Sequence, residues 1–224
     1  MVRGRSGPRA LMLATALGCF VLFVMSGVVA TVGRAGTGID RSMFDMVVES
    51  RNLAVIEAAN DIVSLGQFAP LLALVLLCAG SLLIRKVDRF SAVIPLLAMV
   101  ITAALVSVMK RFVARPGPGL LIRLAREGPY SFPSGHAALS AAVLISIGLV
   151  VTVDAGLSRS VRQAVLWVCA VTCGLVSAST VVLYMHWPAD AVAGSSLGAM
   201  VALVVFTAVR SFQTSRSLQR PDSD

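Results

Sequence analysis

Charged side chains are scarce in this sequence of 224 residues. Asp, Glu, Lys and Arg together make up 13% of it, whereas about a quarter is usual in soluble domains. Hydrophobic residues make up 57%, and the mean hydropathy is +0.88, so too few polar side chains remain to cover a globule in water. This composition excludes an ordinary soluble enzyme, a disordered chain and a fibrous repeat. It predicts a protein that is surrounded by membrane lipids.

Cysteine is also sparse, and its four copies lie in apolar stretches at Cys19, Cys78, Cys169 and Cys173. None has a second cysteine at zinc-finger spacing with a histidine nearby, so we expect neither a disulfide framework nor a metal site. We expect these thiols to pack as small hydrophobic groups. The formal net charge of +8 would suit nucleic acid, but the basic residues are distributed between apolar runs, as in membrane proteins. We therefore expect no nucleic-acid partner.

Six apolar runs approach or exceed the length of about 20 residues that a helix needs to cross a bilayer. They are Ala10–Val32, Ile62–Ile84, Phe90–Met109, Ala137–Val153, Ala164–Met185 and Ala191–Val209. No linker or internal repeat divides the chain, so we predict one all-α membrane domain over residues 1–224, a bundle of six transmembrane helices. Arginines precede the first run, as in a signal peptide, but its 23 uncharged residues exceed the usual core of about 7–15. We expect it to remain as an anchor.

Lys and Arg gather at alternate ends of the predicted helices. With the N-terminus inside, the inner segments hold eleven basic residues, against three in the first outer segment, residues 33–61. The positive-inside rule then predicts an integral protein of the cell membrane with short cytoplasmic tails at 1–9 and 210–224. Within the outer segment, apolar residues recur at helical spacing from Met43 to Ile62, which predicts an extracytoplasmic amphipathic helix on the surface.

One predicted outer loop opposes this charge rule. Its basic residues are Lys110, Arg111, Arg115, Arg123 and Arg126, with Glu127 as the sole acid. Three explanations fit basic residues on the outer side, namely random sequence drift, contact with lipid head groups and an anion-binding site. For the last of these, phosphate is the simplest ligand.

The chain has two histidines, His136 and His186, and both lie at the predicted outer edge beside that loop. His136 ends the segment Ser131–His136, in which Ser134 is expected to cap the next helix, whose free amides favour an anion. Four residues after His186, Asp190 can reach one imidazole nitrogen, fix its tautomer and stabilise the imidazolium. Two imidazoles beside a cationic loop suit phosphoryl transfer, which needs a nucleophile, a proton donor and fixed positive charge.

These motifs resemble those of the type 2 phosphatidic acid phosphatase superfamily, membrane lipid phosphatases related to vanadium haloperoxidases. Pro133–His136 is similar to the second family motif, and Ser179 with His186 and Asp190 to the third. Lys110 followed by Arg115–Pro118 resembles the first motif, and the likeness extends over about residues 38–209. The resemblance implies six transmembrane helices, an extracytoplasmic site, hydrolysis of lipid phosphates or pyrophosphates without metal or cofactor, and a phosphohistidine intermediate.

The resemblance also implies a role for each matching residue. His186 would attack phosphorus, Asp190 would support it, and His136 would protonate the leaving oxygen. The phosphoryl oxygens would be held by Lys110, Ser134 and the amide of Gly135.

Two positions depart from the family pattern, because Gly117 and Thr180 stand where the first and third motifs have arginine. Removing one preorganised donor from such a site typically costs about 100-fold or more in rate. We expect Arg115, two residues before Gly117, to take over phosphate binding, with Arg111 and Arg123 as alternatives.

Three functions fit these observations. The first is a membrane hydrolase of the cell envelope that acts on a lipid-linked phosphate, such as polyprenyl pyrophosphate or phosphatidic acid. The second is a weak or inactive lipid-phosphate-binding protein that keeps the phosphatase fold. The third is an anion transporter, which ranks last because the expected internal symmetry is missing. Small residues from Ala193 to Ala199 permit close helix packing within one bundle or between two, which leaves the oligomeric state open.

Overall fold

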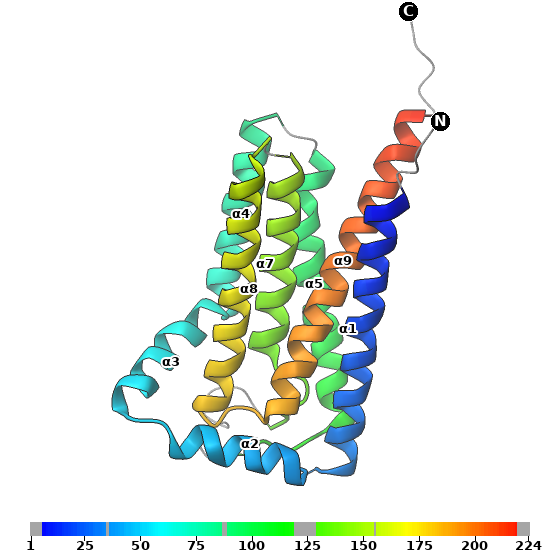
Figure 1. Ribbon diagram of the computed structural model, residues 1–224. Helices are drawn as coiled ribbons and strands as arrows, with labels where there is room; N and C mark the ends of the chain where they lie inside the picture. The colour runs from blue at the N-terminus through cyan, green and yellow to red at the C-terminus, as the bar shows by residue number, and fades with distance from the viewer. Residues whose placement is uncertain (1–5, 35, 87–88, 119–128, 155, 219–224) are drawn as a thin grey trace, which may run out of the picture.

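The computed structural model describes residues 6–34, 36–86, 89–118, 129–154 and 156–218. These ranges contain eight α-helices and no strand, which confirms the all-α fold class. The helices are α1 (Ser6–Val32), α2 (Gly38–Glu49), α3 (Leu53–Leu65), α4 (Phe68–Ile84), α5 (Arg89–Val113), α7 (Gly135–Asp154), α8 (Arg159–Val182) and α9 (Pro188–Leu218). Figure 1 shows the long helices side by side, with α2 lying across one end of the bundle.

Within the described ranges, five helices are long and apolar enough to cross a membrane, namely α1, α5, α7, α8 and α9. A sixth crossing needs α3 and α4 together, and these two helices meet at a bend of 49°. The predicted run Ile62–Ile84 is therefore corrected, because its first residues belong to α3. Gly66 is the C-cap of α3, and Gln67 is the N-cap of α4. Helix α4 alone has 17 residues, fewer than the roughly 20 that span a bilayer.

Other predicted helix ends also differ from the structure, and those of α8 and α9 show why. Helix α8 stops at Val182, before the predicted end at Met185, because the chain turns at Tyr184 with a φ of 58°. Helix α9 continues past Val209 to Leu218, since polar residues extend the helix beyond the apolar run that hydropathy detects.

The outer amphipathic segment forms two helices where the sequence predicted one. Thr37 caps α2 by accepting a hydrogen bond from the amide of Asp40, and Asn52 caps α3 by accepting one from Val55. An Asn cap starts a new helix because its side chain satisfies an amide that has no partner within the helix. Helix α2 is amphipathic as predicted, with Phe44 buried toward the bundle and Asp45 and Glu49 exposed, although Asp40 is buried and Ile39 is 75% exposed.

Helices α7 and α9 pack closely through the small residues of α9. A Cβ atom built on Gly194 would overlap the carbonyl oxygen of Ser134, and one on Gly198 would overlap that of Ala138. Only glycine permits this approach. The small-residue stretch of α9 therefore serves packing within one bundle. Of the four cysteines, Cys173 is buried and the other three are half-buried.

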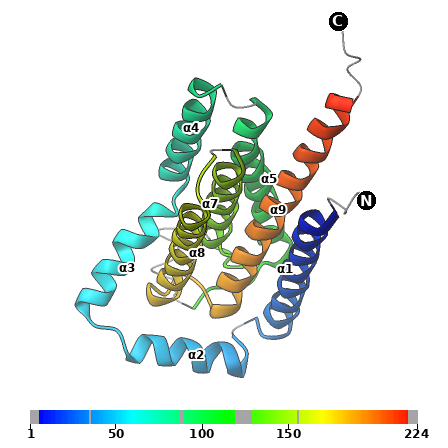
Figure 2. The same cartoon turned by 45° about the horizontal axis from the view of Figure 1, so that its top comes forward.

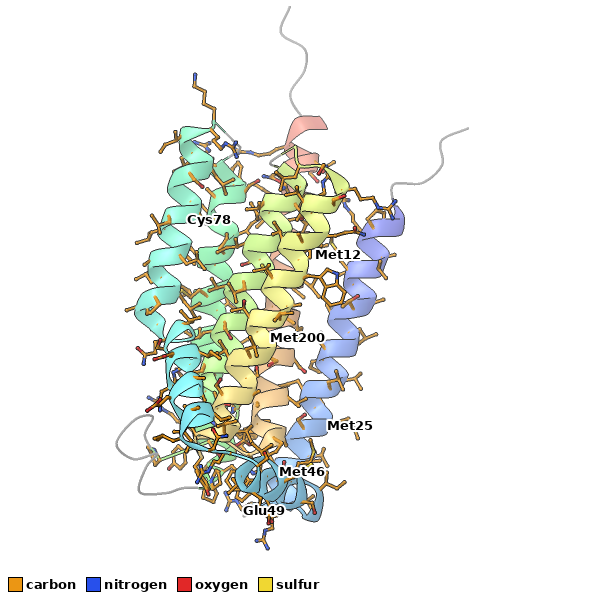
Figure 3. The ribbon with its side chains drawn as sticks, turned by 60° about the vertical axis from the view of Figure 1, so that its left-hand side comes forward. Met12, Met25, Met46, Glu49, Cys78 and Met200 are labelled. Atoms are coloured by element: carbon orange, nitrogen blue, oxygen red, sulfur yellow. The ribbon has the colours of Figure 1, made fainter. Side chains whose placement is uncertain are left out.

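The beginning of α1 and the end of α9 lie at the same end of the bundle, opposite α2 (Figures 1 and 2). Arg9 donates a hydrogen bond to Thr214 across these two helices at 3.2 Å. In Figure 3, Met12 of α1 lies toward that end, whereas Met46 and Glu49 of α2 lie at the other. The molecule thus has one end with the two chain termini and one end with the surface helices.

Candidate active site

A buried series of ion pairs connects the surface helix α2 with the start of α9. Arg115 follows α5 and donates from Nη1 to Oδ1 of Asp190 at 2.6 Å and from Nη2 to Oδ2 of Asp40 at 2.5 Å. The side chains of Arg115 and Asp190 are 0% exposed, and that of Asp40 is 4% exposed. Buried charges are tolerated only when they are paired, so each of these residues depends on the others.

His186 lies in the turn between α8 and α9, next to this network. Its backbone amide and that of Met185 donate to the carbonyl oxygen of Thr180 at 3.2 and 2.9 Å. The His186 side chain is 0% exposed, and its Nδ1 lies 3.8 Å from Oδ2 of Asp190. That distance suits an ion pair and exceeds a hydrogen bond. The structure thus brings the predicted nucleophile and its carboxylate together, in a geometry that often tightens when substrate binds.

The second histidine stands at the start of α7, as the sequence predicted. Ser134 caps this helix, because its Oγ accepts a hydrogen bond from the amide of Ala137 at 3.4 Å. The amide of Ser134 donates to the carbonyl oxygen of Asp190 at 3.0 Å. This bond joins the two histidine-containing motifs. His136, in the first turn of α7, remains half-buried.

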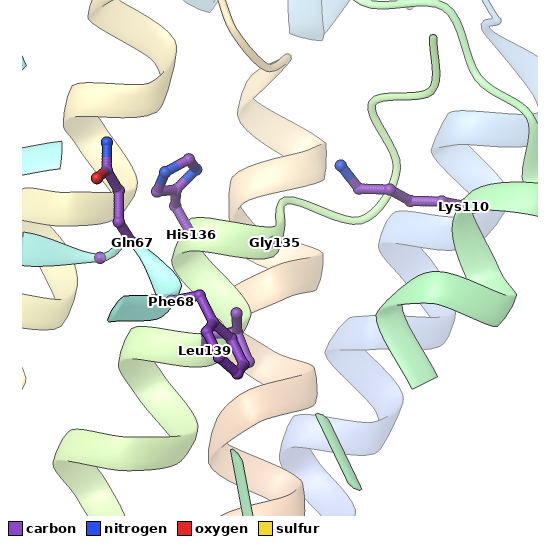
Figure 4. A pocket seen from close by; sticks show the side chains of 7 residues that line it. Gln67, Phe68, Lys110, Gly135, His136 and Leu139 are labelled. Atoms are coloured by element: carbon purple, nitrogen blue, oxygen red, sulfur yellow. The ribbon is translucent and has the colours of Figure 1, made fainter. Parts of the chain in front are cut away.

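His136 lies between two cavities that adjoin at the bend of α3 and α4. One has a volume of about 240 Å³ and is lined by Gly66, Gln67, Phe68, Lys110, Gly135, His136 and Leu139. The other has a volume of about 400 Å³ and is lined by Asn60, Val63, Gln67, His136 and Met185. In Figure 4, Lys110 from α5 and His136 from α7 point into the same space.

The electrostatics of this space favour an anion. Lys110 brings an ammonium group from the last turn of α5, and the amides at the start of α7 carry partial positive charge. Met185, which directly precedes His186, lines the larger cavity together with His136. His186 itself lines neither cavity, so the larger cavity reaches the turn that carries His186 through Met185. Among the described residues, no cluster of three or more His, Cys, Asp or Glu side chains could hold a metal ion.

Arg115 stands apart from this anion site, contrary to the expectation that it binds phosphate. Its guanidinium is 0% exposed and bonds to two carboxylates and to the carbonyl oxygen of Gly33. Gly117 lines a different cavity of about 420 Å³, beside Trp187 and Arg41 of α2. Arg111 is exposed on α5. Arg123, Arg126 and Glu127 lie outside the described residues.

Sequence reasoning did not single out Asp40, Asn60 or Gln67. The sequence pattern could have identified Asp40, because this residue shares the apolar face of α2 with Phe44. A lone acidic residue on an apolar face indicates a buried partner of opposite charge. Asn60 and Gln67 carry no such signal, since hydropathy merges the two helices whose bend they flank.

A model of the PAP2 superfamily matches residues 91–213 of the chain, which is more than half of its length. The crystal structure of a transmembrane PAP2-type phosphatidylglycerolphosphate phosphatase from Bacillus subtilis is similar, with a TM-score of 0.76 and 25% identity over 92% of this chain and 99% of that one. LpxE from Aquifex aeolicus shares the fold, with a TM-score of 0.61 and 18% identity over 77% of this chain and 97% of that one. No curated protein gave a significant match.

Proposed function

Because the chain belongs to the PAP2 superfamily, we propose that it is an integral membrane phosphatase that hydrolyses a lipid-linked phosphate or pyrophosphate. The observation that carries this proposal is the grouping of His186, Asp190, His136 and Lys110 at one end of the bundle. These residues supply a nucleophile with its carboxylate, a proton donor and a fixed cation, which are the groups that phosphoryl transfer requires.

In this proposal, Nε2 of His186 attacks phosphorus, since Nδ1 is the nitrogen that faces Asp190. The bond between phosphorus and the leaving oxygen breaks as His136 donates its proton to that oxygen. The product is a phosphohistidine whose positive charge Asp190 stabilises. Water, deprotonated by His136, then attacks phosphorus and releases inorganic phosphate, which restores both histidines.

Binding of the phosphoryl group falls to Lys110 and to the free amides at the start of α7, including that of Gly135. Both line the smaller cavity and provide the positive potential that three anionic oxygens need. Ser134 supports this helix start through its cap, and its hydroxyl proton would donate to a phosphoryl oxygen. Arg115 acts on Asp190 rather than on the phosphate.

The leaving group would occupy the cavities beside His136, because the acid must reach the leaving oxygen. Phe68 and Leu139 add apolar surface to the smaller cavity beside Lys110, whereas Asn60 and Gln67 bring neutral amides to the larger one. This combination suits a polar group joined to a lipid tail. The Bacillus subtilis relative is named for phosphatidylglycerolphosphate, which joins phosphatidic acid and polyprenyl pyrophosphate as candidate substrates here.

Phosphate release from these three lipids by purified protein in detergent tests the proposal. We expect turnover of at least one lipid, unchanged by a metal chelator, and none with His186→Ala. Turnover that requires added zinc or magnesium would contradict a histidine nucleophile and favour metal-activated water.

A second candidate function is a lipid-phosphate-binding protein without turnover. It is favoured by the absence of arginine at Gly117 and Thr180 and by the burial of Arg115. Binding of lipid phosphate without release of phosphate, under every condition tried, would establish this function and contradict the first.

We further propose that the site is extracytoplasmic and that both tails lie in the cytoplasm, because basic residues flank the ends opposite α2. Cysteine introduced at the exposed Glu49 should react with an impermeant thiol reagent in intact cells, and cysteine at the exposed Ser158 should not. The reverse labelling would overturn this orientation.

A further inference from the structure

The buried ion network contains one carboxylate that the proposed reaction does not touch, that of Asp40. This residue lies on the surface helix α2, 150 residues before Asp190 in the sequence. Its Oδ2 pairs with Nη2 of Arg115 at 2.5 Å, and its Oδ1 accepts a hydrogen bond from the amide of Ala189 at 2.9 Å. Asp40 therefore contacts both the cationic partner of Asp190 and the backbone beside it.

We propose that Asp40 is a positioning residue for the reaction at His186, acting through Arg115 and Asp190. This inference rests on the proposed phosphatase function. It assigns to α2 a part in the chemistry, in addition to its place on the membrane surface.

The geometry of Arg115 is the first argument. A guanidinium is planar, and its N–H donors have fixed directions. A hydrogen bond to one Nη atom therefore sets the direction in which the other Nη atom donates. Arg115 uses Nη1 for Asp190 and Nη2 for Asp40. With Asp40 in place, the guanidinium has one orientation, and the carboxylate of Asp190 is held with Oδ2 toward His186.

Charge is the second argument. Asp40, Arg115 and Asp190 together carry a net charge of −1, which is buried beside an imidazole that becomes positive when it takes the phosphoryl group. Without the charge of Asp40, the remaining pair of Arg115 and Asp190 is neutral, so the net negative charge beside the imidazolium of His186 is lost. Such effects are strong in a buried site, where the effective dielectric constant is low.

A purely structural role makes a different prediction. If Asp40 only fastens α2 to α9 through the amide of Ala189, its removal should have the same effect whether or not Arg115 is present. If it acts through Arg115, its effect should vanish when Arg115 is gone. A double-mutant cycle separates the two roles.

The cycle compares Asp40→Asn, Arg115→Gln and the double variant in the full-length protein, with kcat and KM measured on the best lipid substrate. We expect Asp40→Asn to lower kcat about tenfold, a typical coupling for a buried network. KM should stay unchanged, because Asp40 does not line the substrate cavities. In the Arg115→Gln background, the same change should alter kcat less than about twofold.

Glu49→Gln is the matched control, since it removes one negative charge from the same helix at an exposed position. Its kcat should equal that of the wild type. If Asp40→Asn does not fold, the double variant still decides, because a neutral Asn–Gln pair replaces Asp40 and Arg115 and leaves Asp190 as the one ion of the network. Its kcat should match that of Arg115→Gln.

Two results would overturn the positioning role of Asp40 while leaving the proposed phosphatase function intact. One is an unchanged kcat in Asp40→Asn, and the other is an equal loss of kcat with and without Arg115. A wild-type protein that releases no phosphate from any lipid would overturn the proposed function together with this inference.

Discussion

The two histidines of the site occupy different surroundings. His136 is half-buried between two cavities and shares its space with Lys110, whereas His186 is 0% exposed and lies beside the buried network of Asp190 and Arg115. A proton donor that also activates water needs access to the substrate and solvent. A nucleophile needs a fixed orientation and a partner for its developing charge. The difference therefore matches the two roles that we propose.

Lys110 and Arg115 differ in the same way. Lys110 lines the open cavity with His136, and Arg115 is enclosed by carboxylates. In the proposed reaction, Lys110 would bind the incoming anion and Arg115 would hold the carboxylate of Asp190. Basic residues five positions apart in the chain would thus serve binding and positioning separately.

The largest expected effect comes from His186 and Asp190, the buried residues of the site. His186→Ala should lower kcat by a factor of about 10⁴ or more, because the nucleophile is lost. Asp190→Asn should lower it by about 10²–10⁴ while the protein still folds, since the amide cannot stabilise the imidazolium. Phosphate release and thermal unfolding in detergent measure both effects. Activity of His186→Ala above a few per cent of wild type would contradict the proposed nucleophile.

The second prediction separates the two cations. Lys110→Ala should lower kcat/KM by about 10²–10³ with little change in the unfolding temperature, because it removes a charge donor from an open cavity. Arg115→Ala should also destabilise the fold, by about 3–5 kcal/mol, because it leaves Asp40 and Asp190 buried without their partner.

Thermal unfolding and kinetics of the two variants provide the measurement. If Arg115→Ala keeps the wild-type unfolding temperature and loses only phosphate affinity, the buried network is not what holds Asp190. The original expectation of a phosphate-binding Arg115 would then be correct.

The sequence predicted the proximity of His186 and Asp190 but not the contacts of Arg115, for a physical reason. Residues in one turn, such as His186 and Asp190, are brought together by local backbone geometry, which spacing reveals. The pair of Asp40 and Arg115 joins residues 75 positions apart, and no local rule indicates that contact. Charge patterns located Arg115 in the outer loop, but they do not show which way a side chain faces.

The fold shows the same limit. Hydropathy located the candidate membrane helices, because each of them contains a continuous run of apolar residues. It missed the bend at Gly66, because neither Gly66 nor Gln67 interrupts the apolar pattern strongly enough to be seen. That bend forms the wall of both cavities beside His136, so the substrate side of the site was hidden from sequence analysis.

The third prediction concerns the position of the missing arginine near His186. Thr180→Arg restores the family residue and would raise activity only if the structure had space for the larger side chain. Thr180 is 0% exposed, and its carbonyl oxygen accepts the amides of Met185 and His186. An arginine there introduces a larger, charged side chain into a packed turn, which typically costs about 1–3 kcal/mol from overpacking alone.

We therefore expect Thr180→Arg to lower the unfolding temperature and the activity together, as measured by thermal unfolding and phosphate release. Thr180→Ser, which keeps a hydroxyl and removes one methyl group, is the control and should retain most of both. A gain of activity in Thr180→Arg would show that the turn opens toward the phosphate and that this position can still accept the family residue.

The smallest effect is expected at Gln67, in the cavities beside His136. Its side chain lines both cavities beside His136 and points alongside it in Figure 4. Gln67→Leu keeps a similar volume but removes the amide, so a substrate that hydrogen-bonds to it should lose about 3- to 10-fold in kcat/KM, the value of one net hydrogen bond. A substrate without polar groups near the leaving oxygen should be unaffected. The ratio of kcat/KM for phosphatidylglycerolphosphate to that for phosphatidic acid measures this difference, because the first has an additional glycerol next to its terminal phosphate.

An unchanged ratio would show that Gln67 does not contact the leaving group, whereas a lower ratio would place the glycerol beside His136.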